Sequence, residues 1–307
     1  MTDVDSVLLV TKGLDLGGIE RVVVDLAKGL RRAGVHTEVA VVNGRRAQFA
    51  PVLRAEGIPV HLLEGTDRLG VRGVRQLLRL VREPRFRLVH VHGPLPTVVA
   101  RMARVGLGGR PVVTTVHTLW AAHRLPSRVV WRLTARLDAA TVAVSQAVAD
   151  SLPGRRDVSV VPHGVDDVAV AAARSTAAMR APAPLPTVVV VASHRGVKNY
   201  PNLLKAIHHA RKRGTSAHVL AIGEGPDLAA HQRLADELTL RDVVEFLGPR
   251  LDVLEVMATA DLLVVASDRE GQPLVVSEAL ALGVPVVATS VGRVPELVDE
   301  SVGRVVP

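Results

Sequence analysis

Two glutamates, Glu270 and Glu278, stand eight positions apart in the stretch DREGQPLVVSEAL and enclose an almost wholly apolar run. Pro273 suits the first position of a helix, so the sequence predicts a turn at 268–272 and a helix after it. The helical part of the gap is then under about 10 Å, comparable to the distance between the two sugar rings of a nucleotide diphosphate sugar. Carboxylates accept hydrogen bonds from vicinal hydroxyls, and free N–H groups at the helix start attract anions. The alternative is an acidic helix start that the helix dipole stabilises.

A glycine-rich turn, LGGIE at 16–20, separates the first predicted strand from the first predicted helix. Gly17 and Gly18 let the backbone approach a ligand closely, and the following helix start favours negative charge. A plain strand-to-helix turn is the alternative. Neither a G-x-G-x-x-G fingerprint nor a Walker A sequence occurs, so the pattern indicates no dinucleotide or P-loop site.

Histidines are the next residues that could act in catalysis or bind a metal. His90 and His92 alternate along LVHVHG and share one face of a predicted strand. This spacing is compatible with metal binding, but no further ligand set accompanies it, so a pair at a strand end is favoured. The chain has no cysteine, which excludes disulfides and thiolate metal sites. His163, in VPHGVD, is expected to shape the turn between two domains and is not placed in catalysis.

Short Val-rich runs alternate with longer helical patterns, which predicts parallel sheets covered by helices on both faces. The segment 173–186 contains Ala, Pro and Ser without periodicity and is interpreted as a linker between domains at 1–172 and 187–307. Open α/β sheets bind ligands at the carboxyl ends of their strands. The predicted class is α/β, with two Rossmann-like doubly wound domains facing a central cleft. The expected strands are 6–11, 37–43, 59–64, 88–93, 111–117, 140–145, 158–164, 187–193, 218–225, 243–248, 261–267 and 284–289.

The formal charge of +8 is unevenly distributed over the 307 residues. Residues 1–180 hold 26 Lys and Arg against 15 Asp and Glu, whereas residues 181–307 hold 12 against 15. This asymmetry favours an anionic partner for the first half, with an Arg-biased proteome as an equal alternative. Two helical runs carry arginine stripes that would hold this domain on anionic lipid, with solvated helix faces as the alternative. The stripes are Arg72, Arg75, Arg79 and Arg82, and Arg124, Arg128, Arg132 and Arg136.

Composition also limits the function classes. With 3 Phe, 2 Trp and 1 Tyr, the chain is poor in the rings on which single-stranded nucleic acids stack, so no nucleic-acid partner is expected. No apolar run reaches the roughly 18 residues of a spanning helix, and the N-terminus does not resemble a signal peptide. We therefore expect a cytoplasmic protein, at most peripheral at the inner face of the membrane.

Three longer stretches resemble a known family. EGQPLVVSEALALGVPVVATSVGRVPELV at 270–298 combines the two glutamates with a Gly-x-Pro-Val-Val-Ala-Thr run and a Pro-Glu pair, and LGGIERVVVDLAKGL and VPHGVD accompany it. With these motifs the chain resembles the retaining glycosyltransferase family 4, which implies the GT-B fold. Arg293 replaces the second glycine of the family's VGG loop. The chain ends at VGRVVP where relatives continue through further helices, so the resemblance implies an incomplete second domain.

The resemblance implies a role for each matching residue. Glu270 would contact hydroxyls of the transferred sugar, and Glu278 the ribose of the nucleotide. Arg195 and Lys198 would bind the diphosphate, because two cations can neutralise the departing group. His117, at the carboxyl edge of its strand, would face the donor sugar, and no metal would be required. The other donor-binding positions would be Gly17, Gly18, Gly223, Gly271, Gln272, Pro273 and Leu274.

The function expected from this resemblance is transfer of a sugar, with retention, from a nucleotide-diphosphate sugar to a hydroxyl acceptor. Lipid-linked and cell-envelope glycans are among the acceptors considered, and the sequence identifies neither base, sugar nor acceptor. The alternatives are an inactive GT-B-like protein that binds nucleotide sugars and a sugar-nucleotide epimerase.

Overall fold

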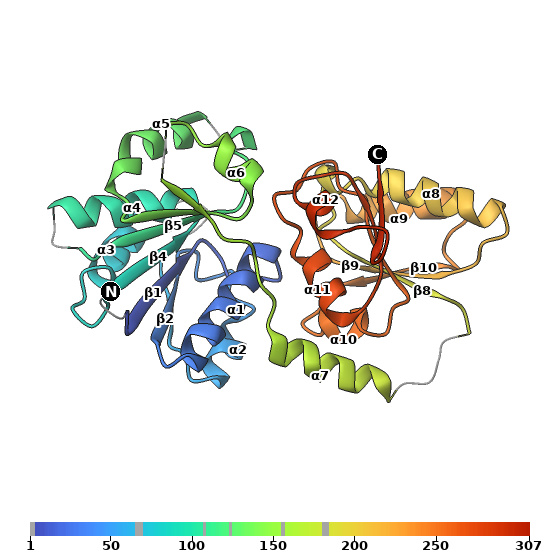
Figure 1. The fold of residues 1–307 in the computed structure, drawn as a ribbon, viewed down its shortest axis with the longest axis horizontal. Coiled ribbons are helices and arrows are strands. Elements are labelled where there is room, and N and C mark those ends of the chain that lie inside the picture. Colours follow the sequence, from blue (N-terminus) through green and yellow to red (C-terminus); the bar gives the residue numbers. More distant parts are fainter. Residues whose placement is uncertain (1–3, 65–69, 107–108, 123–124, 155–156, 180–183) are drawn as a thin grey trace. The chain divides into compact units, whose positions relative to one another are not determined.

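The computed structural model describes residues 4–64, 70–106, 109–122, 125–154, 157–179 and 184–307. They form two compact units, Met1–His163 and Gly164–Pro307, which Figure 1 colours from blue to green and from green to red. Each unit contains one sheet with its own cores. This confirms the α/β class with two Rossmann-like domains.

The sheet of the first unit has seven strands in the order β3-β2-β1-β4-β5-β6-β7, and each pairing is parallel. The strands are β1 (Ser6–Thr11), β2 (His36–Val41), β3 (Val60–Leu62), β4 (Leu88–His92), β5 (Val112–Val116), β6 (Ala140–Ala143) and β7 (Val158–Val160). Each overlaps a segment that the Val-rich pattern predicts.

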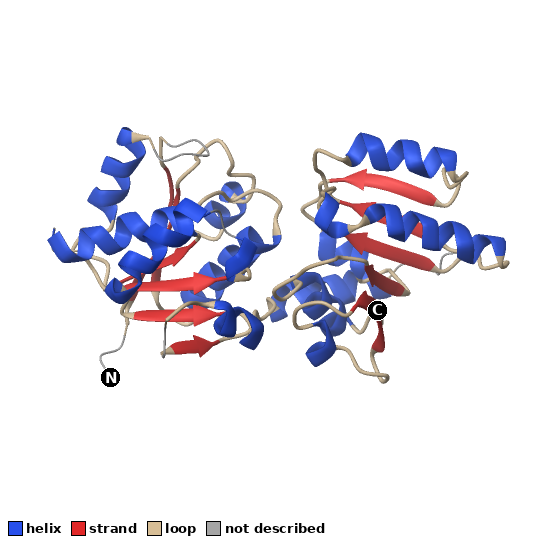
Figure 2. Ribbon diagram, turned by 90° about the horizontal axis from the view of Figure 1, so that it is seen from above, coloured by secondary structure: helices blue, strands red, loops and turns tan. Residues whose placement is uncertain are grey.

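Helices cover both faces of this sheet, as Figure 2 shows. Alternate residues of β1 point to opposite faces, so Leu9 packs with Val23 of α1 while Leu8 packs with Leu77 of α3. Burial on both faces explains why the strands are almost continuously apolar. The helices are α1 (Gly18–Arg32), α2 (Ala50–Ala55), α3 (Val71–Leu80), α4 (Pro94–Gly106), α5 (Leu125–Thr134) and α6 (Gln146–Ser151), with 3₁₀ turns η1 (Trp120–Ala122) and η2 (Ala135–Leu137).

The second unit has a six-stranded sheet in the order β10-β9-β8-β11-β12-β13, again with parallel pairings. Its strands are β8 (Thr187–Val191), β9 (His218–Ile222), β10 (Val244–Gly248), β11 (Leu262–Val265), β12 (Val286–Thr289) and β13 (Gly303–Val306). The pattern did not predict β13, whose four residues pair with β12.

Two cores lie on the two faces of this second sheet. Val189 belongs to one core and Val190 to the other, as expected for neighbouring residues of a strand. The helices are α7 (Asp167–Ala178), α8 (Tyr200–Lys212), α9 (Leu228–Glu237), α10 (Val253–Met257), α11 (Leu274–Leu282) and α12 (Val294–Leu297), with the 3₁₀ turn η3 (Gly196–Lys198).

The boundary between the units differs from the expected one. The chain divides after His163, and α7 occupies 167–178, where the sequence suggests the end of one domain and the start of a linker. Asp166 caps this helix through the N–H of Ala169, and Ala173 is buried in a core of the second unit. Residues 180–183 of the expected linker lie outside the described part.

Candidate functional site

In the second unit, the two glutamates of the opening motif lie on α11 and the turn before it. Pro273 is the N-cap residue, so the helix begins one position later than predicted, at Leu274, and Gly283 ends it in the left-handed conformation. Glu278 is only 6% exposed. A carboxylate this deeply buried on a helix needs polar partners.

The turn carrying Glu270 meets the turn carrying Lys198. Because β8 and β11 are parallel neighbours, the loops after them lie side by side. Lys198 Nζ donates to Glu270 Oε1 over 2.5 Å. The Asp268 N–H donates to the Val197 carbonyl at 2.9 Å, and Asn199 Nδ2 donates to Asp268 Oδ1 at 2.7 Å. Two of the predicted catalytic residues are therefore held together as an ion pair.

Arg195 caps η3 and is exposed, and the residue before it is firmly fixed. His194 is fully buried, stacks on Tyr200 with ring centroids 4.1 Å apart, and its Nδ1 lies 3.0 Å from His231 Nδ1. Burial lowers the pKa of His194 to about 4, with a further contribution from His231. Sequence reasoning missed this neutral imidazole, although it directly precedes the basic pair.

Gly223 also supports the basic loop. Its φ of 146° is one that side chains rarely adopt, and a Cβ there would lie 2.1 Å from the Ala192 carbonyl oxygen. A Cβ on Gly225 would likewise lie 2.3 Å from the His194 carbonyl oxygen. These close approaches require glycine for packing, whether or not the loop also contacts a ligand.

Arg293, the departure from the family's VGG loop, packs against the turn that follows Glu270. Its N–H donates to the Gly271 carbonyl at 3.1 Å, and its Nη1 donates to Gln272 Oε1 at 3.4 Å. Its Nε also donates to Glu296 at 2.6 Å. The backbone N–H of Arg293 thus holds the backbone of Gly271, and its guanidinium holds the side chain of Gln272.

In the first unit, the glycine-rich turn begins α1 as predicted. Gly17 is the N-cap and Gly18 the first helical residue. The Glu20 carboxylate folds back over this turn, so that a Cβ on Gly17 would lie 2.4 Å from its Oε2. Burial raises the pKa of Glu20. The helix start expected to attract an anion is thus approached by a carboxylate of the chain itself.

Three histidines form a chain at the carboxyl edge of the first sheet. His92 Nδ1 lies 2.9 Å from His117 Nε2, and His117 Nδ1 lies 3.3 Å from His163 Nε2. Burial lowers the pKa of His117 to about 3 and that of His92 well below 6.5. His117 is therefore neutral, and both its ring nitrogens are occupied by other imidazoles. His163, which sequence analysis left aside, is part of this arrangement.

The buried end of this row of histidines, His92, indicates which imidazole donates to which. His92 Nε2 is buried without a hydrogen-bond partner among the described residues. An orphaned N–H is rarer than an orphaned acceptor, so we assign the proton of His92 to Nδ1. His92 then donates to His117, and His117 donates to the partly exposed His163. Among the described residues, no cluster of three or more His, Asp or Glu could hold a metal ion.

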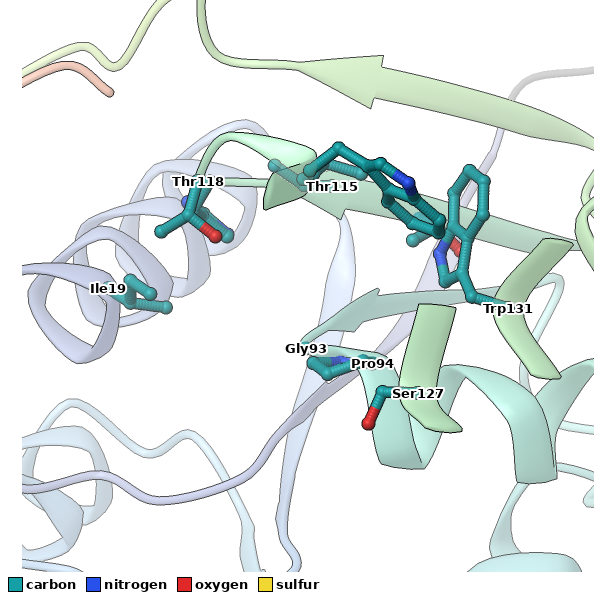
Figure 3. A pocket seen from close by; sticks show the side chains of 11 residues that line it. Ile19, Gly93, Pro94, Thr115, Thr118, Ser127 and Trp131 are labelled. Atoms are coloured by element: carbon teal, nitrogen blue, oxygen red, sulfur yellow. The ribbon is translucent and has the colours of Figure 1, made fainter. Parts of the chain in front are cut away.

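A pocket lies beside His117, between the start of α1, the turn after β4 and α5. It encloses about 70 Å³, or about 500 Å³ with its open mouth. Figure 3 shows Ile19 on one side, Trp131 and Ser127 of α5 on another, and Gly93 at the turn. The pocket thus joins the glycine-rich turn and His117, which the sequence could not bring together.

A buried ion pair supports the wall of this pocket. Arg101 of α4 and Asp138 are both fully buried and joined by bonds of 2.7 and 2.6 Å. Asp138 also accepts from Thr114 and Thr141, at 3.0 and 2.8 Å. The Arg101 guanidinium lies 4.8 Å from the centre of the Trp131 ring. Two pocket residues are thereby fixed by one network.

Two doubly wound sheets with a glycine-rich turn in the first unit and a Lys–Glu pair in the second define a GT-B-type glycosyltransferase. The family model for "Glycosyltransferase Family 4" matches residues 16–168, and that for "Glycosyl transferases group 1" matches residues 176–307. The chain belongs to glycosyltransferase family 4, a retaining family whose donors are nucleotide sugars.

Two curated relatives match nearly the whole chain. The putative glycosyltransferase EpsF of Bacillus subtilis is 28% identical over 97% of this chain and 82% of its own length. The D-inositol 3-phosphate glycosyltransferase of Mycolicibacterium smegmatis is 32% identical over 94% of this chain and 74% of its own. A crystal structure of HepE from Anabaena with UDP and glucose matches with a TM-score of 0.80, covering 99% of this chain and 86% of that one at 21% identity.

Proposed function

We propose that this protein transfers a hexose from a UDP-sugar to an acceptor hydroxyl. The observation that carries the proposal is the Lys198–Glu270 pair at the carboxyl ends of two neighbouring strands, beside the start of α11. A cation and a carboxylate next to free helix N–H groups suit a sugar joined to a diphosphate. UDP is chosen because HepE was crystallised with UDP and glucose.

Binding of this donor requires the pair to separate. Lys198, together with Arg195, turns to the diphosphate oxygens, and Glu270 accepts hydrogen bonds from hydroxyls of the sugar. Glu278 accepts hydrogen bonds from the ribose. Each charged group exchanges its partner in the protein for one in the ligand, so neither is left unpaired in the complex.

In the transfer step, the bond between the anomeric carbon and the diphosphate oxygen breaks, and the acceptor oxygen bonds to the same face of that carbon. A phosphate oxygen of the departing diphosphate takes the acceptor's proton. The cations stabilise the charge that develops on the leaving group, and no protein nucleophile is needed.

Incubation with radiolabelled UDP-sugars and a panel of hydroxyl acceptors tests the proposal. Transfer of label with retention supports it. Donor binding without turnover favours the inactive binding protein, and interconversion of the free sugar nucleotide favours the epimerase. Label transferred only from nucleotides of another base would reject UDP and leave the transferase function standing.

We also propose that the enzyme acts at an anionic membrane surface on the cytoplasmic side. On α5, Leu125, Val129 and Leu133 repeat every four residues and are 69%, 51% and 77% exposed. Arg128 and Arg132 lie on the same helix. An exposed apolar stripe flanked by arginines suits the interface of an anionic bilayer. In the described part of the chain, no helix is both long and apolar enough to cross a membrane.

The stripe on α3 supports this proposal less well. Arg72 pairs with Glu64 at 3.4 Å, and Arg82 Nε donates to the Leu78 carbonyl at 2.9 Å. Arg124 of the other stripe lies outside the described residues. Sedimentation with anionic liposomes is expected to pull down the protein. Leu133→Asn is expected to weaken this binding, whereas Val71→Asn, at an exposed position of α3, is not. Equal, negligible binding to anionic and neutral liposomes would reject the surface.

A further inference from the structure

The pocket beside His117 has polar residues in its wall but almost no polar surface. Thr114 donates its hydroxyl to Asp138 at 3.0 Å, and the Thr115 hydroxyl lies 2.7 Å from His90 Nε2. Both ring nitrogens of His117 are hydrogen-bonded, one to His92 and the other to His163. Because these polar atoms are occupied within the protein, this part of the wall offers the pocket mainly carbon.

Two aromatic rings complete this apolar wall. Trp120 and Trp131 meet edge to face with centroids 5.1 Å apart, and Arg101 holds the second ring from behind. Ile19 of α1 closes the opposite side (Figure 3). Rings fixed in this way form a preformed apolar surface that costs little entropy to use.

We propose that this pocket binds an aliphatic chain of the acceptor, so that the acceptor is an alcohol on an apolar carbon skeleton and not a polyol or free sugar. The inference rests on the proposed function, because it names the chemical class of the acceptor in that transfer. The enclosed volume of about 70 Å³ favours a chain over a ring, since benzene occupies an engineered cavity of about 150 Å³.

The surroundings of the pocket support an aliphatic occupant. Ser127 and Trp131 of α5 line the pocket, while Leu125, Val129 and Leu133 of the same helix are exposed. An acceptor with an aliphatic chain can thus contact apolar side chains both inside the pocket and on the surface of this helix. A hydroxyl of a polyol held against the faces of the two tryptophan rings would lack a partner, which weakens binding about tenfold or more.

The protein allows a direct binding assay, because its two tryptophans, Trp120 and Trp131, both line the pocket. We expect 1-butanol to 1-octanol to change tryptophan fluorescence, with affinity rising about fourfold per methylene until the pocket is full. Glycerol and myo-inositol should produce no saturable change. Saturable binding of the polyols, of benzyl alcohol in preference to the alkanols, or of neither class would overturn the inference.

A matched pair of variants locates the binding. Ser127→Phe fills the pocket from α5 and should weaken 1-octanol binding at least tenfold, whereas Val71→Phe adds the same ring at an exposed position of α3 and should leave binding unchanged. If Ser127→Phe fails to fold by circular dichroism, Ile19→Asn replaces it. Equal alkanol binding in wild type and both variants would contradict the pocket assignment.

The binding assay needs no nucleotide sugar, so the two proposals fail separately. Alkanol binding without sugar transfer to any alcohol rejects the transferase and leaves the apolar pocket. Transfer of a sugar to polyols, with no alkanol binding and no transfer to 1-octanol, rejects the aliphatic acceptor and leaves the transferase.

Discussion

The ion pair between Lys198 and Glu270 predicts an unusual response to Glu270→Gln. The pair spans 2.5 Å, and its side chains are 23% and 13% exposed. Exposed pairs contribute up to about 1 kcal/mol, and this partly enclosed one should be near that limit. A diphosphate must break the pair to reach Lys198. Removing the Glu270 charge should therefore tighten binding of the free nucleoside diphosphate by about fivefold.

Turnover should change in the opposite direction. A hydrogen bond from a sugar hydroxyl to a carboxylate is worth about 1.5–3 kcal/mol, so loss of the Glu270 charge should slow kcat by about 10- to 100-fold. Calorimetric titration with UDP, combined with initial rates, measures both effects. Glu278→Gln should weaken UDP binding, because the ribose is present in that ligand too, and Lys198→Ala should weaken it as well.

An exposed ion pair of the same unit supplies the control. Arg211 and Asp242 are joined at 2.6 Å on the surface, so Asp242→Asn breaks a pair without touching the site. It should leave UDP affinity and turnover unchanged. Weaker UDP binding in Glu270→Gln, by the same factor as in Glu278→Gln, would refute the competition between the ligand and the ion pair. The two glutamates would then be a local electrostatic feature of the helix.

Three further outcomes are expected. Arg101→Met removes the guanidinium that pairs with the buried Asp138 carboxylate and should lower the free energy of unfolding of the first unit by about 3–5 kcal/mol, measured by urea unfolding with tryptophan fluorescence; an unchanged midpoint would contradict this. Acid should destabilise the same unit, because the lowered pKa values of His92 and His117 mean that unfolding takes up protons below about pH 6.5. The loss should be about 2 kcal/mol per histidine between pH 6.5 and pH 5, with full stability above that window, and a flat profile would show that these imidazoles are not buried neutral. Gly223→Ala should reduce the thermal stability of the second unit, where Gly196→Ala, with open space around its Cβ, should not.

Much of the fold could be predicted because parallel strands buried on both faces leave a plain record in the sequence. Each expected strand segment overlaps an observed strand, and the turn before α11 follows from Gly271 and Pro273. The error at α7 has a physical cause. Ala173 is small enough to pack in a core, but a run of alanines shows no apolar stripe, so the helix looked like a linker.

The sequence by itself determined the doubly wound class, the family motifs and the residue types available at the strand ends, because these depend on local composition and spacing. Only the tertiary structure decided which of them meet. Lys198 and Glu270 are 72 positions apart and pair because β8 lies beside β11, an adjacency that neither segment encodes alone. His117 is a neutral imidazole between two other imidazoles, and the Thr114 hydroxyl is bonded to Asp138. In both cases the hydrogen-bond partners come from other strands and loops. The charge, tautomer and polarity of a site depend on such neighbours, and sequence spacing does not specify them.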